Sequence, residues 1–344
     1  MWQQIDIENE QQWQEYRGTG IGASEAPTLL GYNEFQSRLE LFHKKVGFKP
    51  SNFANIKMLY GHVAEELNND LFRAYNGDDD MLAQRVRDKK FIRDCYKLPK
   101  HSFIVNKDIC PHLFVSPDRF FYDKEKGIEG CLEMKNTSLM YLNKYIDKTS
   151  PSHIIQLNTQ MLTWEQKYGY LCYIIDSGSY REQLFEYNGN IFEDRFNGDV
   201  ISSEAFIQKV NEFWEAVVLA RDLTHKIKVA QLNFQLDKVE QYKAILSELE
   251  PEPDATLAYE NYVKEEYLSL GKNLIEIQGN ETHEKIAVDY LLAQEKFKEA
   301  SKNFQLQKNK IYDACKEGQK IILGKTKFIE VKSTKAGTKI NVKY

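Results

Sequence analysis

Three side chains that together can hold a divalent cation and activate water lie near one another in the sequence. Glu133 and Lys135 stand two residues apart in Cys-Leu-Glu-Met-Lys, and Asp118 lies upstream in Ser-Pro-Asp. Because side chains alternate along a strand, we expect Glu133 and Lys135 on one face and Met134 on the other. Two carboxylates suit a hard cation, and an ammonium group can polarise the attacking water. This set is the minimum needed to hydrolyse a phosphodiester with a metal ion.

The elements that must position these residues are predicted to be neighbouring strands. Asp118 separates the apolar segment 113–115 from 119–122, and a turn at 124–127 leads into 128–135. Adjacent strands stand about 4.8 Å apart, so Asp118 and Glu133 can reach one cation. Glu and Lys two apart on a strand are more often a solvated face. The neighbouring strands are therefore what favours a nuclease.

Composition is that of a soluble globular protein, with 344 residues, 42% hydrophobic and 28% charged. No apolar run approaches the ~20 residues needed to span a bilayer. The first residues show no secretion signal, so we expect a cytosolic protein. Five scattered cysteines without a C-x-x-C pair argue against disulfides and against zinc or iron–sulfur sites.

The net charge of −5 weakens a nucleic-acid interpretation slightly, because phosphate contacts usually require a basic surface. It does not exclude an acidic nuclease whose basic residues line a groove and whose site is neutralised by metal ions. The basic run 85–93 has two interpretations, contact with backbone phosphates or a solvated surface, and the second is favoured.

The first ~220 residues alternate between helix and strand signals. Further helices are predicted at 24–30, 39–47, 61–75, 153–168 and 206–219, and further strands at 103–105, 170–176 and 183–187. The third of these helices has Val63, Leu67, Leu71 and Phe72 at helical spacing.

After ~220 the pattern changes to long helices. Apolar residues recur in steps of three and four through 239–249 and again through 286–314, where Gln307 is the one polar exception. The prolines of 251–253 interrupt the pattern between these two segments. An intramolecular helical hairpin is favoured over a functional coiled coil. The tail, 320–344, alternates as two strands around 335–337.

Six features in chain order resemble the YqaJ-like viral recombinase family, to which lambda exonuclease belongs. They are the segments 17–26 (an "IGASE" opening), 29–47, 61–65, 114–118 ("SPD"), 132–135 ("LExK") and 156–161 ("QxxxQM"). Together they cover roughly residues 15–180, and the region after ~220 is not covered well. Arg119 departs from the family, in which glycine is common after the aspartate. A second expected difference is the length of the hairpin between Asp118 and Glu133, which we expect to be longer than in the compact members.

The resemblance implies a metal-dependent exonuclease of the PD-(D/E)xK type that uses Mg²⁺ or Mn²⁺ on linear duplex DNA. It implies Asp118 and Glu133 as metal ligands, the carbonyl of Met134 as a further oxygen, and Lys135 as the water-activating lysine. It further implies Glu65 as a carboxylate that faces the site. Gln156, together with Gln160, would place the lysine, the water or the DNA. Arg17 and Ser24 would lie near the phosphate.

Each of these latter roles has a structural alternative. Glu66 is adjacent to Glu65, and either carboxylate fits a solvated surface. One of the two glutamines, a helical turn apart, fits the cap of a sheet edge. Ser24 also fits a helix N-cap. Arg17 also fits a structural ion pair.

The fold expected is α/β, a PD-(D/E)xK nuclease core with a central mixed β-sheet flanked by helices and a helical C-terminal extension. The domains expected are residues 1–220, 221–319 (helical) and 320–344 (strands). The function expected is a Mg²⁺-dependent DNA exonuclease of phage or prophage recombination, acting on double-stranded ends. The resemblance also suggests a ring-shaped homo-oligomer, perhaps a trimer, and a single-strand-annealing partner. The alternatives are a restriction- or repair-type endonuclease on the same core and a non-catalytic DNA-binding scaffold.

Overall fold

The protein is described from a computed structural model. The residues described are 1–49, 56–145, 147–176, 178–194, 198–268, 278–315, 320–322, 328–334 and 337–343. Within these ranges no helix is long and apolar enough to cross a bilayer.

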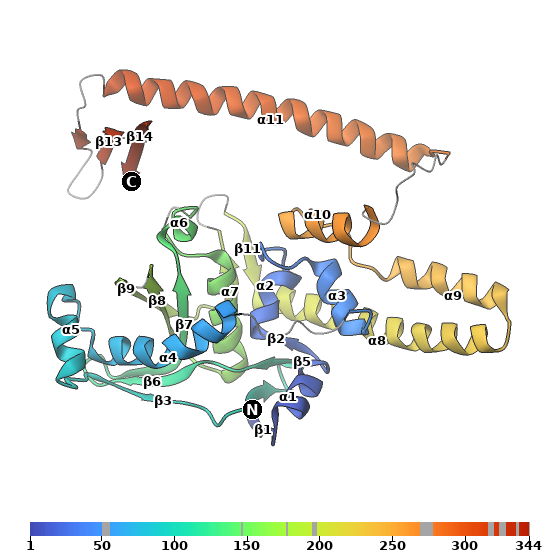
Figure 1. The fold of residues 1–344 in the computed structure, drawn as a ribbon, viewed down its shortest axis with the longest axis horizontal. Helices are drawn as coiled ribbons and strands as arrows, with labels where there is room; N and C mark the ends of the chain where they lie inside the picture. The colour runs from blue at the N-terminus through green and yellow to red at the C-terminus, as the bar shows by residue number, and fades with distance from the viewer. Residues whose placement is uncertain are drawn as a thin grey trace. The chain divides into compact units, whose positions relative to one another are not determined.

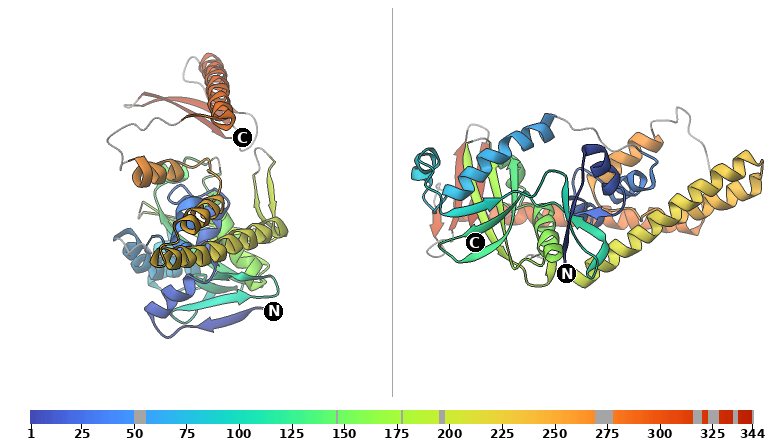
Figure 2. Two further views of the ribbon diagram at one scale, coloured as in Figure 1. Left: turned by 90° about the vertical axis from the view of Figure 1, so that its right-hand side faces the viewer. Right: turned by 90° about the horizontal axis from the view of Figure 1, so that it is seen from below.

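The chain forms two compact units, Met1–Leu270 and Gly271–Tyr344. This division differs from the ranges predicted from sequence. Helix α8 (Ser203–Leu232) continues through residue 220 without interruption, and α9 (Leu236–Glu248) packs back against it. Figure 2 shows the two helices side by side, as a hairpin that belongs to the first unit.

A five-stranded mixed sheet lies at the centre of the first unit, in the order β3-β6-β7-β8-β9 (Figure 1). Its strands are β3 (Arg93–Tyr96), β6 (Arg119–Asp123), β7 (Ile128–Thr137), β8 (Tyr168–Ile175) and β9 (Ser179–Glu186). Only the pair β7–β8 of this sheet is parallel. The predicted α/β class with a central mixed sheet and flanking helices is confirmed.

Two helices cover the two faces of this sheet. Helix α7 (Pro151–Trp164) connects the parallel strands β7 and β8 and packs on one face through Leu157 and Met161. Helix α4 (Ile56–Ala74) packs on the other face through Phe72. A Cβ on Gly169 of β8 would lie 2.9 Å from the sulfur of Met161, so glycine at this position lets α7 approach the sheet closely.

A smaller four-stranded sheet has the order β1-β4-β5-β2. Its strands are β1 (Gln3–Asp6), β2 (Ile21–Gly22), β4 (Ser102–Asn106) and β5 (Cys110–Val115), and β2 runs parallel to β5. Helix α1 (Glu10–Arg17) precedes β2; the 3₁₀ turn η1 (Ala23–Glu25), α2 (Ala26–Leu29) and α3 (Arg38–Val46) follow it. Helix α3 ends as predicted at Gly47, whose φ of 97° is left-handed.

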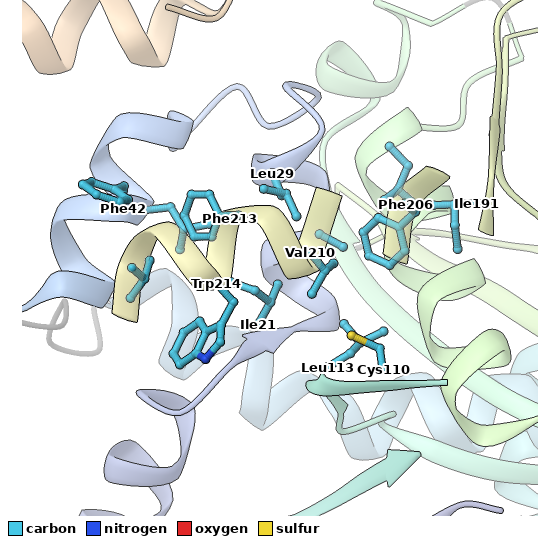
Figure 3. Close-up of a cluster of buried hydrophobic side chains, with 14 of the residues drawn as sticks. Ile21, Leu29, Phe42, Cys110, Leu113, Ile191, Phe206, Val210, Phe213 and Trp214 are labelled. Atoms are coloured by element: carbon cyan, nitrogen blue, oxygen red, sulfur yellow. The ribbon is translucent and has the colours of Figure 1, made fainter. Parts of the chain in front are cut away.

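A buried apolar cluster joins α8 to these N-terminal elements (Figure 3). Phe206, Val210 and Phe213 of α8 belong to the same buried cluster as Ile21 of β2 and Leu113 of β5. The cluster fixes β2 and η1 beside the end of β5. It thereby holds the segment that carries Ser24 close to the central sheet.

The remaining elements are short, except for one long helix in the second unit. The first unit has α5 (Asp79–Arg87), α6 (Leu139–Leu142), β10 (Asn190–Glu193), β11 (Val200–Ser202), α10 (Leu257–Val263) and the π-helix η2 (Lys264–Leu268). The second has α11 (Glu281–Ala314), β12 (Lys320–Ile322), β13 (Phe328–Thr334) and β14 (Gly337–Lys343). Figure 1 shows α11 as one uninterrupted helix.

The predicted strands and helices are present, with four differences. Helix α7 ends at Trp164 rather than at residue 168, where β8 has already begun. Helix α4 buries Ala64, Asn68 and Phe72, whereas Val63 and Leu67 of the predicted stripe are exposed. The tail holds three strands instead of two, and residues 335 and 336 of the expected turn lie outside the described ranges.

The fourth difference concerns Arg93, which the sequence placed in a solvated basic run. Its guanidinium is buried, 3.0 Å from Asp123 and 2.7 Å from Glu182, and lies over the ring of Phe72. It also donates to the carbonyl of Phe72 at 2.9 Å. These contacts join β3, β6, β9 and α4, so the network spans the α4 face of the sheet.

Replacing Arg93 by methionine is predicted to destabilise the protein by about 3–5 kcal/mol, because Asp123 and Glu182 would be left as uncompensated buried charges. The free energy of unfolding from chemical denaturation measures the loss. Lys226→Met, which removes an exposed partner of Asp222, is the matched control and should leave stability unchanged within error. Equal losses in the two variants would contradict the importance of the buried network.

Candidate active site

The ladder between β6 and β7 places Asp118 opposite Glu133. Arg119 pairs with Leu132 in this antiparallel register, and Asp118 stands one residue before β6. The N–H of Met134 donates to Oδ2 of Asp118 at 2.7 Å. The backbone of β7 therefore fixes the Asp118 carboxylate directly beside the segment that carries Glu133 and Lys135.

Glu133 and Lys135 lie on the α7 face of β7, and Met134 points to the α4 face. The side chain of Met134 belongs to the apolar cluster of Phe72, whereas Cys131, in phase with Glu133, packs in the cluster of Leu157. The ammonium of Lys135 lies 2.5 Å from Oε1 of Glu133. Only 3% of Glu133 is exposed, so this carboxylate lies within the protein interior.

Two glutamines of α7, one helical turn apart, hold both oxygens of the Glu133 carboxylate. Gln156 donates to Oε1 at 2.7 Å and Gln160 donates to Oε2 at 2.6 Å. The side-chain carbonyl of Gln156 also accepts from Lys135 at 3.0 Å. Gln156 thus bridges the carboxylate and the ammonium, while Gln160, which is fully buried, contacts the carboxylate alone.

The charges of the site do not balance among its own side chains. Burial first, and then the nearby charge of Glu133, raise the pKa of Asp118 well above its ordinary value. Burial by itself would lower the pKa of Lys135, but Glu133 and Asp118 raise it above its usual range. One ammonium therefore faces two carboxylates in a poorly solvated place, and this surplus of negative charge favours a bound proton or a cation.

The donor chemistry fits a divalent metal of the Mg²⁺ type. Such an ion is usually held by one or two carboxylates together with water and substrate phosphate oxygens. Asp118 and Glu133 would supply the carboxylates. Across the described part of the chain, no three His, Cys, Asp or Glu side chains gather closely enough to form a metal site by themselves. A metal here would depend on these two carboxylates and on oxygens of the backbone, water and substrate.

Glu65 approaches from the α4 side. Its carboxylate lies 3.2 Å from the ammonium of Lys97 and 3.8 Å from Arg119, and its charge contributes to raising the pKa of Asp118. Glu66 is bonded to Arg119 at 2.6 Å, and 71% of its side chain is exposed. Of the two neighbouring glutamates, Glu65 is the one whose charge is felt at Asp118.

Arg119 and Lys97 were not among the candidate residues. Arg119 is buried, donates to the backbone carbonyl of Asp118 at 2.8 Å, and contacts both glutamates of α4. It therefore links the strand end that bears Asp118 to helix α4. The departure from glycine at this position was the one sequence signal that pointed to it.

Arg17 and Ser24 lie in the N-terminal segment rather than among the bonded site residues. The guanidinium of Arg17 lies over the ring of Trp13 and 3.9 Å from Glu25. Ser24 is exposed in η1, which packs against α7 and β5. Buried Lys45 pairs with Glu25 at 2.7 Å and donates to the carbonyl of Arg17, which ties the segment together.

His153, one turn before Gln156 on α7, supplies a neutral group near the site. Burial, and secondarily the charge of Lys135, lower its pKa to about 3. Its Nδ1 lies 3.0 Å from the hydroxyl of Tyr173. At neutral pH this imidazole adds no charge to the balance described above.

Comparison with known proteins gives three findings. Residues 12–166, which include every bonded residue of the site, match the family model of the YqaJ-like viral recombinase domain. "Uncharacterized protein YqaJ" of Bacillus subtilis (strain 168) is 24% identical over 315 residues, which are 91% of this chain and 80% of that protein.

The third finding is a likeness to solved structures of an alkaline exonuclease from Laribacter hongkongensis. One structure is 15% identical, with a TM-score of 0.41, and the match covers 65% of this chain and 100% of that one. The complex of that enzyme with dAMP is 14% identical, with a TM-score of 0.43, and the match covers 66% of this chain and 100% of the other.

Asp118→Asn is predicted to stabilise the metal-free protein at pH 8, by roughly 0.5–2 kcal/mol, the usual size of a stabilising substitution. The raised pKa of Asp118 means that its ionisation opposes folding, so stability is lost as pH rises from the ordinary value of 3.8 through the folded-state pKa. Asparagine keeps the acceptor for Met134 without the charge.

Chemical denaturation with a chelator over a pH series measures this effect. The difference from wild type should vanish below about pH 3.8, where both aspartate states are protonated. Added Mg²⁺ should stabilise the wild type more than Asp118→Asn. A variant that is less stable than wild type at pH 8 without metal would contradict this account of the site.

Proposed function

We propose that the protein is a metal-dependent DNA exonuclease that digests linear double-stranded DNA from its ends, because residues 12–166 match the family model of the YqaJ-like viral recombinase domain. The observation that carries the proposal is the buried Glu133 carboxylate, bonded to Lys135 and Gln156, with Asp118 held beside it by the N–H of Met134. The matched region contains this whole set.

The arrangement suits in-line hydrolysis of a phosphodiester. Asp118 and Glu133 would hold Mg²⁺ or Mn²⁺, with the carbonyl of Met134 as a further oxygen. Glu65 would join them as a third carboxylate by leaving its contacts with Lys97 and Arg119 when the metal binds. The metal would supply an activated water and charge neutralisation at the phosphate. We propose two ions, since one can serve the attacking oxygen and the other the leaving 3′ oxygen.

Among the side chains of the protein, Lys135 would supply the positively charged hydrogen-bond donor of the reaction. Its raised pKa keeps the ammonium charged at neutral pH, so it can donate to the attacking water or to a phosphate oxygen as negative charge develops. Gln156 accepts from this ammonium and donates to Glu133, which fixes the distance between the two. Gln160 holds the second carboxylate oxygen, so it acts as a positioning residue.

The DNA would reach this site past the segment that holds Arg17 and Ser24. The exposed hydroxyl of Ser24 and the partly exposed guanidinium of Arg17 suit contacts to a phosphate. We also propose, from the family relationship, a ring-shaped homo-oligomer around DNA and a partner that anneals the single strand produced.

The purified protein is predicted to release label from end-labelled linear duplex DNA when Mg²⁺ is present, and to lose this activity in a chelator. Covalently closed circular duplex should stay intact in the same reaction, because it has no ends. Degradation of the closed circle at a comparable rate would instead assign an endonuclease. Which end loses label gives the polarity.

Lys135→Met is predicted to reduce the rate on linear duplex by at least about 10²–10³-fold, because a charged donor aimed at the reacting phosphate is lost. Lys167→Met is the matched control, since Lys167 is an exposed lysine paired with Glu186 at the start of β8. The control should keep wild-type activity. Wild-type activity in Lys135→Met would remove this lysine from the mechanism.

A further inference from the structure

Helix α11 carries an apolar stripe with a seven-residue repeat, which we call the α11 seam. The seam residues alternate in steps of four and three along the helix: Ile286, Tyr290, Ala293, Phe297, Ala300, Phe304, Gln307, Ile311 and Ala314. The large rings are exposed, at 65% for Tyr290, 72% for Phe297 and 71% for Phe304. Within their own unit, the described residues of Gly271–Tyr344 therefore leave most of this stripe uncovered.

The repeat identifies the kind of surface that the seam fits. A stripe with a period of 3.5 residues faces another helix that winds around it, as in a coiled coil. The large residues occupy the position that starts each repeat (Tyr290, Phe297, Phe304 and Ile311). After Ile286, the small or polar residues occupy the other position (Ala293, Ala300, Gln307 and Ala314).

We propose that the α11 seam pairs with the same seam of a second copy of this chain, with the two helices antiparallel. A parallel pair in register would place aromatic rings against aromatic rings, alanine against alanine, and Gln307 against Gln307. An antiparallel pair can place the large residues Phe297 and Phe304 opposite alanines. Close packing of large against small side chains is what a well-filled helix interface requires.

One antiparallel register combines these two layers with an apolar pair at the ends of the seam. It sets Phe297 opposite Ala300 of the second copy, Phe304 opposite Ala293, and Ile286 opposite Ile311. Gln307 then faces Tyr290, whose hydroxyl can pair with the amide, so the one polar seam residue meets the one polar ring. From 286 to 311 at 1.5 Å per residue, the paired region is about 38 Å long.

Charges beside the seam select the same register. In it, Asp289 flanks Lys310 of the second copy, and this pair occurs twice because of the twofold symmetry. A shift by one repeat in one direction would instead bring Lys296 against Lys310 and Phe297 against Gln307. A shift in the other direction would bring Lys296 against Lys296 and Phe304 against Ile286. Both Asp289 and Lys310 are exposed, so the attraction favours the first register without a large desolvation cost.

The first test is the mass of the full-length protein in solution over a concentration series, by sedimentation or light scattering. Phe297→Glu should raise the dissociation constant of the pair at least roughly 100-fold, since two buried rings are lost per dimer, and should halve the number of associated copies. Leu306→Glu is the matched control, because Leu306 is 52% exposed on α11 outside the seam. It should behave as wild type.

Circular dichroism confirms that both variants keep their helix content. A wild type that carries no more copies than Phe297→Glu at any concentration would overturn the proposal, as would a seam covered by another part of the same chain in a monomer. These variants leave the residues of the active site untouched, so the outcome is independent of the nuclease assay.

The second test uses a charge swap to read orientation and register. Asp289→Lys should weaken association roughly 10-fold, because two attractive pairs become repulsive, and adding Lys310→Asp in the same chain should restore it. A parallel pair in register would not place these two positions together, so no restoration would occur. Failure of the double variant to regain wild-type association would refute the antiparallel register.

Discussion

The site is organised by one buried carboxylate and the groups that hold it. Glu133 accepts hydrogen bonds from Lys135, Gln156 and Gln160, and so both of its oxygens are fixed from two different elements. An ionised carboxylate in the interior is costly unless it is paired and hydrogen-bonded. These bonds meet that requirement only in part, because Asp118 adds a second carboxylate nearby. The remaining excess of negative charge makes the place suitable for a cation.

Helix α7 serves the fold and the site with neighbouring residues that all face the sheet. A parallel pair of strands requires a crossover connection, and α7 is the crossover between β7 and β8. Leu157 and Met161 seal it against the sheet, and Gly169 allows the close approach. Gln156 and Gln160 are adjacent to these apolar residues in sequence, so the packing that stabilises the sheet also sets where the amides lie.

The sequence predicted the elements whose periodicity is local. Alternation in β7 placed Glu133 and Lys135 together, and the turn before it brought Asp118 alongside. Contacts between distant segments had no such signal: the ion pair of Arg93 with Glu182 joins β3 to β9, and Arg119 joins β6 to α4. The face of α4 was also misjudged, because its exposed Val63 and Leu67 suggest a core stripe while the buried face includes Asn68. Very short strands such as β2 carry too few residues to show a period.

The alternation of large and small side chains on α11 has a consequence for how the protein behaves at high concentration. A contact in which the same surface serves both partners closes on itself once two copies have met. A staggered, head-to-tail contact between the same aromatic rings would instead leave an unpaired apolar surface on each added copy, so that copies could add without limit and form fibres. Antiparallel pairing would make the α11 contact self-limiting, and it would remove the rings of the α11 seam from solvent.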